Sequence, residues 1–381
     1  MQKSILIDTP VEESTTTLAE YRSIQTLRAI AAMLVALMHL IFFYCDSMKY
    51  IGGSIPKMAD FYFFKGFGGC GIQIFFVISG FIMAFLHAKG ETLSFGDFAT
   101  RRITRIVPLY WIVTLFWAFV LVGSPGVPTL HLINSLLFIP EPDQTPVVGP
   151  GWTLNLEMFF YALFGLSALV FRKSFLWIAI LFLVINSVFY ITGNYVMRLY
   201  SDPIVWNFIA GIAIYHVHRS PMIQRESTAI LYIGVILLIS SIFWHLPDDS
   251  KGIRQFLPWG VPSMLIVLGA VSMESAGNGM RLFRINILLT MGDASYALYL
   301  IHGLCFFGVS NILLYTLKLQ ELTNPDIAII VYLLVCCIIA IAVNKFIEKP
   351  SIRLTRKMFS SIHAILRATT RMLKHFTFSR V

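Results

Sequence analysis

Long runs of apolar residues recur along almost the whole chain, and they constrain its fold more than any other feature. One helix needs about 20 mostly apolar residues to cross a bilayer. Only 13% of the residues are charged, whereas soluble proteins carry about a quarter. We therefore expect an all-α, polytopic transmembrane helical bundle of about ten spanning helices. The expected spans are 27–45, 70–88, 105–123, 150–171, 175–191, 203–218, 228–244, 258–273, 292–316 and 326–346.

The basic residues between these spans predict the orientation of the bundle. An even number of spans puts both termini on one side, and cytoplasmic segments are enriched in Lys and Arg. With both termini cytoplasmic, the inner segments hold roughly three times as many basic residues as the outer ones. We expect a polar cytoplasmic segment over 1–25, a membrane domain over 26–350 and a basic cytoplasmic tail over 351–381. The net charge of +9 then comes from basic residues on the cytoplasmic side of the membrane and from a tail that contacts anionic lipid. It does not indicate binding of nucleic acid.

Two titratable residues inside expected spans are candidates for catalysis. His39 lies in "LVALMHLIFFY" and Glu157 in "GPGWTLNLEMFFYALFG". Eleven residues, or about 16 Å of helix, separate Arg28 from His39, which places His39 and Glu157 at a similar depth in the outer half. A carboxylate bonded to one ring nitrogen would leave the other nitrogen free as a base. The alternatives are a histidine bonded to a neighbouring carbonyl and a structural bond between helices.

Other polar residues extend this candidate site. Arg102 and Arg105 share a helix face at i, i+3, and two guanidinium groups there can grip a phosphorylated ligand or anchor the chain to lipid phosphates. Further side chains could stabilise an oxyanion or bind an acceptor, with helix packing as the alternative. They are Gln73, Ser79, Trp152, Asn155 and His302.

The five cysteines give neither a CxxC pair nor a metal-ligand spacing, so no metal site is expected. Cys45 and Cys70 flank the first expected external loop. A disulfide between these two residues is left open.

Six segments in order resemble the acyltransferase 3 family of integral membrane acyltransferases, over about residues 21–355. They are "LRAIAAMLVALMH", "GIQIFFVISGFIM", "RRITRIVPLYW", "GPGWTLNLEMFFYALFG", "GDASYALYLIHG" and "FIEKPSIRL". The wording "WTLNLEMFFYALF" looks closest to bacterial O-acetyltransferases of exopolysaccharides, including the succinoglycan type. Many relatives carry an acidic residue where this chain has Gln73.

The resemblance implies an enzyme that moves an acetyl or other acyl group from acyl-CoA to a sugar hydroxyl. The matching histidine, His39, is then catalytic with Glu157 as a further candidate, and Arg28, Arg102 and Arg105 handle the acyl-CoA. We expect the donor in a polar cavity between the first, third, fourth and ninth spans. The implied acceptor is an exopolysaccharide or its lipid-linked precursor. The implied location is the bacterial cytoplasmic (inner) membrane.

Two other functions remain open from the residues alone. A proton-coupled transporter or flippase would also use membrane-embedded His and Glu, and a scaffold in a polysaccharide-assembly complex would need neither. The sequence also leaves open the sugar, the acyl group, direct transfer against an acyl-histidine intermediate, and the oligomeric state.

Overall fold

The computed structural model describes residues 21–51, 54–59, 68–89, 95–121, 126–142, 144–171, 175–192, 199–243, 255–310 and 324–361. Within these ranges the chain is helical and forms no extended strand. Each of the ten expected spans contains helix, so the all-α class is confirmed. The expected N-terminal segment (apart from 21–25) and the tail beyond 361 lie outside the described residues.

Twelve α-helices make up most of the described chain. They are α2 (Arg22–Ile51), α4 (Cys70–Ala88), α5 (Phe95–Phe116), α6 (Thr129–Leu136), α7 (Gly151–Phe171), α8 (Phe175–Thr192), α10 (Trp206–Val217), α11 (Pro221–Ser240), α13 (Val261–Ser275), α14 (Asn286–Asp293), α15 (Ser295–Ser310) and α17 (Pro325–Val343). A π-helical turn, η9 (Asn344–Glu348), follows α17, and helix then continues to residue 361.

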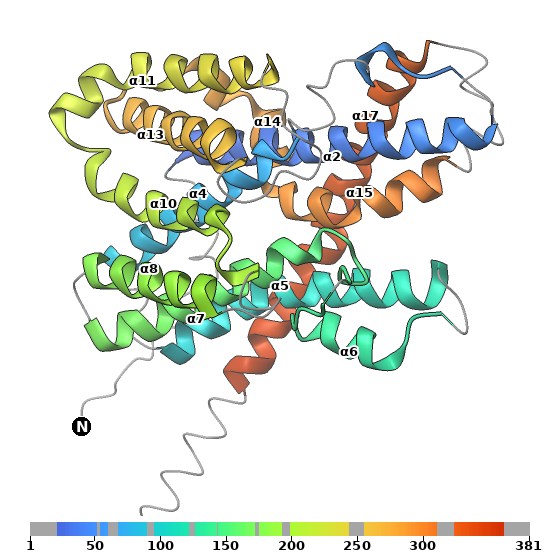
Figure 1. The fold of residues 1–381 in the computed structure, drawn as a ribbon, viewed down its shortest axis with the longest axis horizontal. Coiled ribbons are helices and arrows are strands. Elements are labelled where there is room, and N and C mark those ends of the chain that lie inside the picture. The colour runs from blue at the N-terminus through green and yellow to red at the C-terminus, as the bar shows by residue number, and fades with distance from the viewer. Residues whose placement is uncertain are drawn as a thin grey trace, which may run out of the picture.

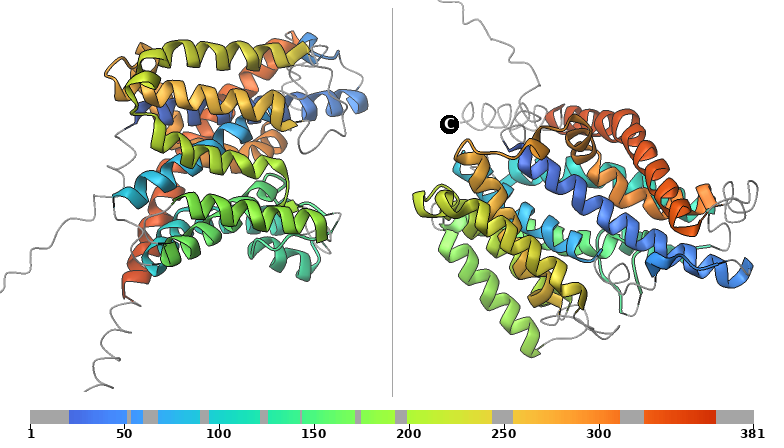
Figure 2. Two further views of the ribbon diagram at one scale, coloured as in Figure 1. Left: turned by 60° about the vertical axis from the view of Figure 1, so that its left-hand side comes forward. Right: turned by 90° about the horizontal axis from the view of Figure 1, so that it is seen from above.

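Helix α2 lies at the centre of the fold. It packs against α4, α13, α14, α15 and α17, and most of its apolar side chains are buried. In Figure 1 a second group, formed by α5, α6, α7 and α8, lies below it, and α17 and its extension run diagonally from one group to the other. Figure 2 shows α11 and α13 side by side along one flank of α2, with α17 on the other flank.

Helix length in the structure supports fewer membrane spans than the hydropathy of the sequence predicts. Among the described residues six helices are long and apolar enough to cross a membrane, or seven if α14 and α15 count as one span. Those two helices meet at a bend of 74°. Helix α10 has only 12 residues and α6 has eight, so each is shorter than the roughly 20 residues that cross a bilayer. The arrangement of ten spans with cytoplasmic termini stays a prediction.

Close backbone contact explains one of the small residues in "VISGF". A Cβ atom on Gly80 of α4 would lie 2.0 Å from the carbonyl oxygen of Phe208 in α10. Small residues commonly allow such approach between membrane helices. Gln73 joins the same two helices, because its side-chain oxygen accepts a hydrogen bond from Asn207.

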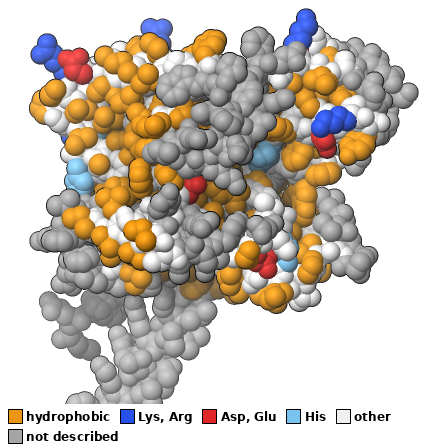
Figure 3. All heavy atoms as spheres, viewed as in Figure 1, with side chains coloured by type: hydrophobic (Ala, Val, Ile, Leu, Met, Phe, Trp, Pro, Cys, Tyr) orange, Lys and Arg blue, Asp and Glu red, His pale blue; other side chains and the backbone are white. Residues whose placement is uncertain are grey.

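The surface agrees with a membrane environment. The face in Figure 3 is covered mainly by hydrophobic side chains, with few charged ones among its described residues. On α11, Tyr232, Ile233 and Ile236 are each at least half exposed. Such contiguous apolar surface fits contact with lipid. The chain is therefore a helical membrane protein.

Candidate active site

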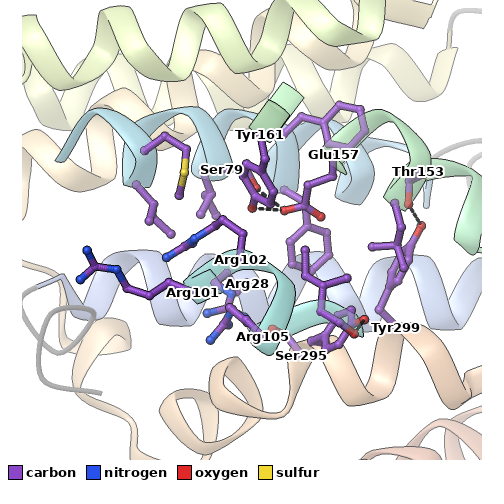
Figure 4. Close-up of a pocket in the computed structure, with 18 of the residues that line it drawn as sticks. Arg28, Ser79, Arg101, Arg102, Arg105, Thr153, Glu157, Tyr161, Ser295 and Tyr299 are labelled. Carbon is purple, nitrogen blue, oxygen red and sulfur yellow. Dashed lines mark hydrogen bonds between the residues drawn. The ribbon is translucent and has the colours of Figure 1, made fainter. Parts of the chain in front are cut away.

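A cavity of about 140 Å³ lies between α2, α4, α5, α7 and α15. A single water needs about 10–15 Å³ on this measure, so a ligand group of several atoms fits. The expected cavity was to lie between α2, α5, α7 and α15, and the structure adds α4 to its wall. Figure 4 shows its labelled side chains, which are Arg28, Ser79, Arg101, Arg102, Arg105, Thr153, Glu157, Tyr161, Ser295 and Tyr299.

Guanidinium groups gather at one side of the cavity. Arg28 from α2 and Arg102 and Arg105 from α5 all line it, as expected. Arg101 and Arg356 join them. The Arg102 guanidinium lies 5.8 Å from the centre of the Tyr161 ring. Within the described residues the Nε of Arg102 is buried without a hydrogen-bond partner. A bound anion could accept a hydrogen bond from this group, which fits an anion-binding site.

Glu157 occupies the middle of the cavity wall and holds two hydroxyl groups. Its Oε1 accepts a hydrogen bond from Ser79 Oγ at 3.1 Å and another from the hydroxyl of Tyr161, one helical turn further along α7. The carboxylate therefore fixes the ring on which Arg102 rests.

Helix α15 leads from the cavity toward the histidines. Ser295, Tyr296 and Tyr299 line the cavity. The hydroxyls of Tyr299 and Thr153 are 2.6 Å apart. The Tyr299 ring lies 6.2 Å from that of His302, one turn further on. Helix α15 thus connects the cavity to His302, although neither His302 nor His39 belongs to the cavity lining.

His39 lies against His302, with 4.8 Å between the ring centres. The Nδ1 of His39 is 2.9 Å from the carbonyl oxygen of Val35. Because a carbonyl oxygen only accepts hydrogen bonds, Nδ1 carries the proton, and Nε2 of the neutral ring keeps its lone pair. His302 uses the carbonyl of Leu298 in the same way, at 3.3 Å.

The expected pairing of His39 with Glu157 is wrong. Glu157 binds Ser79 and Tyr161, whereas the ring nitrogen of His39 binds its own helix. Equal depth along two helices does not make them neighbours. Helix α7 packs on α4, α5 and α8, while α2 meets α15. The alternative of a histidine bonded to a nearby carbonyl describes the observed geometry.

Three other expected site residues, like His39 and His302, lie outside the cavity lining. Gln73 is engaged by Asn207. Trp152 packs on the hydrophobic core. Asn155 is buried, and its Oδ1 has no partner among the described residues. Cys45 and Cys70 are not joined by a disulfide.

Sequence reasoning missed several polar residues of the lining, and two of them had a readable signal. Tyr161 is four residues after Glu157, and Tyr299 is three residues before His302, so helical spacing puts each beside an expected site residue. Arg101 adjoins the expected pair. Arg356 belongs to the segment expected to contact lipid, and it lines the cavity instead. The described residues contain no cluster of three or more His, Cys, Asp or Glu able to hold a metal ion.

A cation-rich cavity in a membrane bundle, with a histidine pair near it on α2 and α15, fits a membrane enzyme that binds an anionic substrate. The acyltransferase domain of the acyltransferase 3 family matches residues 21–344. The chain belongs to this family.

Characterised relatives support the same class. The chain is 34% identical over 251 residues to the exopolysaccharide production protein ExoZ of Rhizobium meliloti, covering 62% of this chain and 75% of that protein. It is 24% identical to the peptidoglycan O-acetyltransferase OatA of Listeria monocytogenes, covering 86% of this chain and 55% of OatA. It is also 24% identical to the acyltransferase MdmB of Streptomyces mycarofaciens, covering 62% of this chain and 67% of MdmB. No solved structure matches.

Proposed function

We propose that the protein transfers an acetyl or other acyl group from acyl-CoA to a sugar hydroxyl of an exopolysaccharide or its lipid-linked precursor. The observation that carries this proposal is the cluster of guanidinium groups in a cavity lined by Tyr299, from which α15 continues to the His39–His302 pair outside the lining. The similarity to ExoZ and OatA supports a polysaccharide acceptor. The proposed location is the bacterial cytoplasmic membrane, with the arginine side facing the cytoplasm.

The donor's phosphates would bind Arg28, Arg102 and Arg105, since guanidinium groups bind phosphate oxygens in a bidentate manner. Arg28 and His39 are eleven residues apart on α2, about 16 Å along the helix axis. An extended pantetheine arm is on the order of 15 Å long, so it can carry the thioester from the arginines toward the histidines.

His39 would act as the general base. Its Nε2 takes the proton of the sugar hydroxyl while the hydroxyl oxygen attacks the thioester carbonyl carbon. The carbon–sulfur bond then breaks, the ester forms, and the thiolate of CoA leaves and takes the proton. In the alternative route, Nε2 accepts the acyl group first and the sugar hydroxyl attacks the acyl-imidazole. Both routes need the tautomer that the Val35 carbonyl enforces.

A direct test uses the purified protein in lipid nanodiscs with radiolabelled acetyl-CoA and deacetylated polysaccharide. We expect label in the polymer with wild type and loss of at least about 100-fold with His39→Ala, the contribution typical of a general base. His216→Ala is the matched control, since His216 lies on α10, a helix that contributes no residue to the cavity lining or to the His39–His302 pair. Transfer by His39→Ala at the wild-type rate would contradict the proposal.

A further inference from the structure

Arg28 is held in place by a neighbour that is not part of the cavity. Arg28 is 6% exposed, and its Nη1 donates to the side-chain oxygen of Gln25 at 3.3 Å. The side-chain nitrogen of Gln25 donates in turn to the Asp293 carboxylate at 3.2 Å. A continuous chain of hydrogen bonds therefore runs from the carboxylate to the cavity arginine.

The chemistry of the three groups fixes the direction of this chain. A guanidinium group only donates and a carboxylate only accepts. The Gln25 amide satisfies both neighbours in one orientation, with its oxygen toward Arg28 and its nitrogen toward Asp293. Without the carboxylate, the amide loses the partner that holds it in this orientation.

The backbone around Asp293 brings it to Gln25. A Cβ atom on Gly292 would lie 2.2 Å from the Gln25 carbonyl oxygen, so only glycine permits this contact between α14 and α2. The backbone oxygen of Asp293 accepts a hydrogen bond from Asn344 at 3.0 Å, and its carboxylate is 3.2 Å from Lys349 Nζ. Asn344 thus holds the backbone of Asp293 at the 74° bend that ends α14, whereas the contact with Lys349 is an exposed ion pair.

The ion pair between Asp293 and Lys349 contributes little to the stability of the fold. The side chains of Asp293 and Lys349 are 47% and 42% exposed, and ion pairs this exposed contribute at most about 1 kcal/mol. Holding a buried guanidinium in one orientation, by contrast, lowers the ordering cost when an anion binds.

We propose that Gln25 and Asp293 are positioning residues that orient Arg28 toward the anionic end of the acyl donor. This inference rests on the proposed function, because it assigns the same cavity to acyl-CoA. Hydrogen bonds therefore connect the segments "IQTLR", "GDASY" and "NKFIEK" at the end of the cavity that is proposed to bind the donor.

The test is the steady-state kinetics of acetyl-CoA with protein in nanodiscs. Gln25→Met and Asp293→Ala should raise KM about five- to tenfold, as expected for one lost hydrogen bond to a charged group, and should change kcat less than about twofold. Asp293→Asn keeps a side-chain oxygen that can accept from Gln25, so its KM should stay near that of wild type. Lys349→Met removes the ion pair alone and is the matched control, with KM expected to be unchanged.

A double-mutant cycle separates positioning from a general structural effect. In an Arg28→Met background, Gln25→Met should raise KM no further, because residues that act through one another are not additive. An additive rise in KM, a fall in kcat without a rise in KM, or the same rise in Lys349→Met would overturn the inference. Wild-type kinetics in both Gln25→Met and Asp293→Ala would overturn it alone, whereas no acetyl transfer by the wild type would overturn the proposed function with it.

Discussion

At the scale of single residues, the tautomer of His39 is set by its own helix. The Val35 carbonyl accepts a hydrogen bond from Nδ1–H, so a base at this position would need no carboxylate partner. Glu157 instead holds Tyr161 beneath Arg102. The two residues of the expected dyad thus have separate partners.

The arginines provide the first prediction. Arg102→Lys and Arg105→Lys should each raise the KM for acetyl-CoA at least about tenfold, because an ammonium group cannot make bidentate contacts with phosphate. The conservative change Arg225→Lys, at an exposed residue of α11, should leave KM unchanged. Wild-type KM values in both α5 variants would remove the arginines from donor binding.

Tyr161 provides the second prediction at this scale. Tyr161→Phe keeps the ring but removes the hydroxyl that donates to Glu157. The partly buried carboxylate then loses one of its two observed donors, and we expect a free energy of unfolding lower by about 0.5–1.5 kcal/mol. The measurement is thermal unfolding in nanodiscs beside Tyr232→Phe, whose ring is exposed on α11. Equal unfolding of the two variants would argue that the Tyr161–Glu157 bond contributes nothing.

At the scale of elements, the start of α2 is capped by another helix. The Glu274 carboxylate in α13 accepts hydrogen bonds from the backbone N–H groups of Arg22 and Ser23, each at 2.9 Å, and from Ser23 Oγ. The first N–H groups of a helix have no partner within it, and a negative charge there also interacts favourably with the helix dipole. Glu274 therefore fixes the end of the helix that carries Arg28.

Glu274→Ala should destabilise the fold by about 1–2 kcal/mol, the usual cost of losing a capping side chain. The expected observation is a lower Tm, with Glu226→Ala on the exposed start of α11 as the control. If the two variants unfold at the same temperature, the cap does not stabilise α2.

The segment between α6 and α7 contains a titratable contact outside the expected spans. Hydrogen bonds from His131 and Asn134 hold the pKa of Glu141 below its ordinary range. A carboxylate whose pKa is lower in the folded state stabilises the fold at pH values above its unfolded-state pKa, about 4.3 for Glu. That stability is lost as the pH falls through the folded-state pKa. The Tm of wild type should exceed that of Glu141→Gln near neutral pH, and the difference should shrink below about pH 4. A difference that does not depend on pH would rule out this carboxylate as its source.

At the scale of the whole molecule, hydropathy locates the helices but does not pair them. The ten apolar ranges all contain helix, and the spacing of Arg102 and Arg105 correctly places both on the cavity face. Which helices touch depends on packing features such as Gly80 against Phe208, which no residue pattern reveals. For this reason residue spacing could not predict the partners of His39 and Glu157. Arg356 was missed because its segment reads as a lipid-facing tail.

We propose that this helical bundle acylates a polysaccharide through His39. The most direct test of this proposal is the O-acetyl content of the surface polysaccharide, measured by proton NMR in cells that carry wild type or His39→Ala at equal membrane levels. We expect the acetyl signal to disappear in the variant while the polymer yield is unchanged. Undiminished acetylation in the variant would contradict the proposal, as would loss of the polymer itself, which would indicate transport or scaffolding instead.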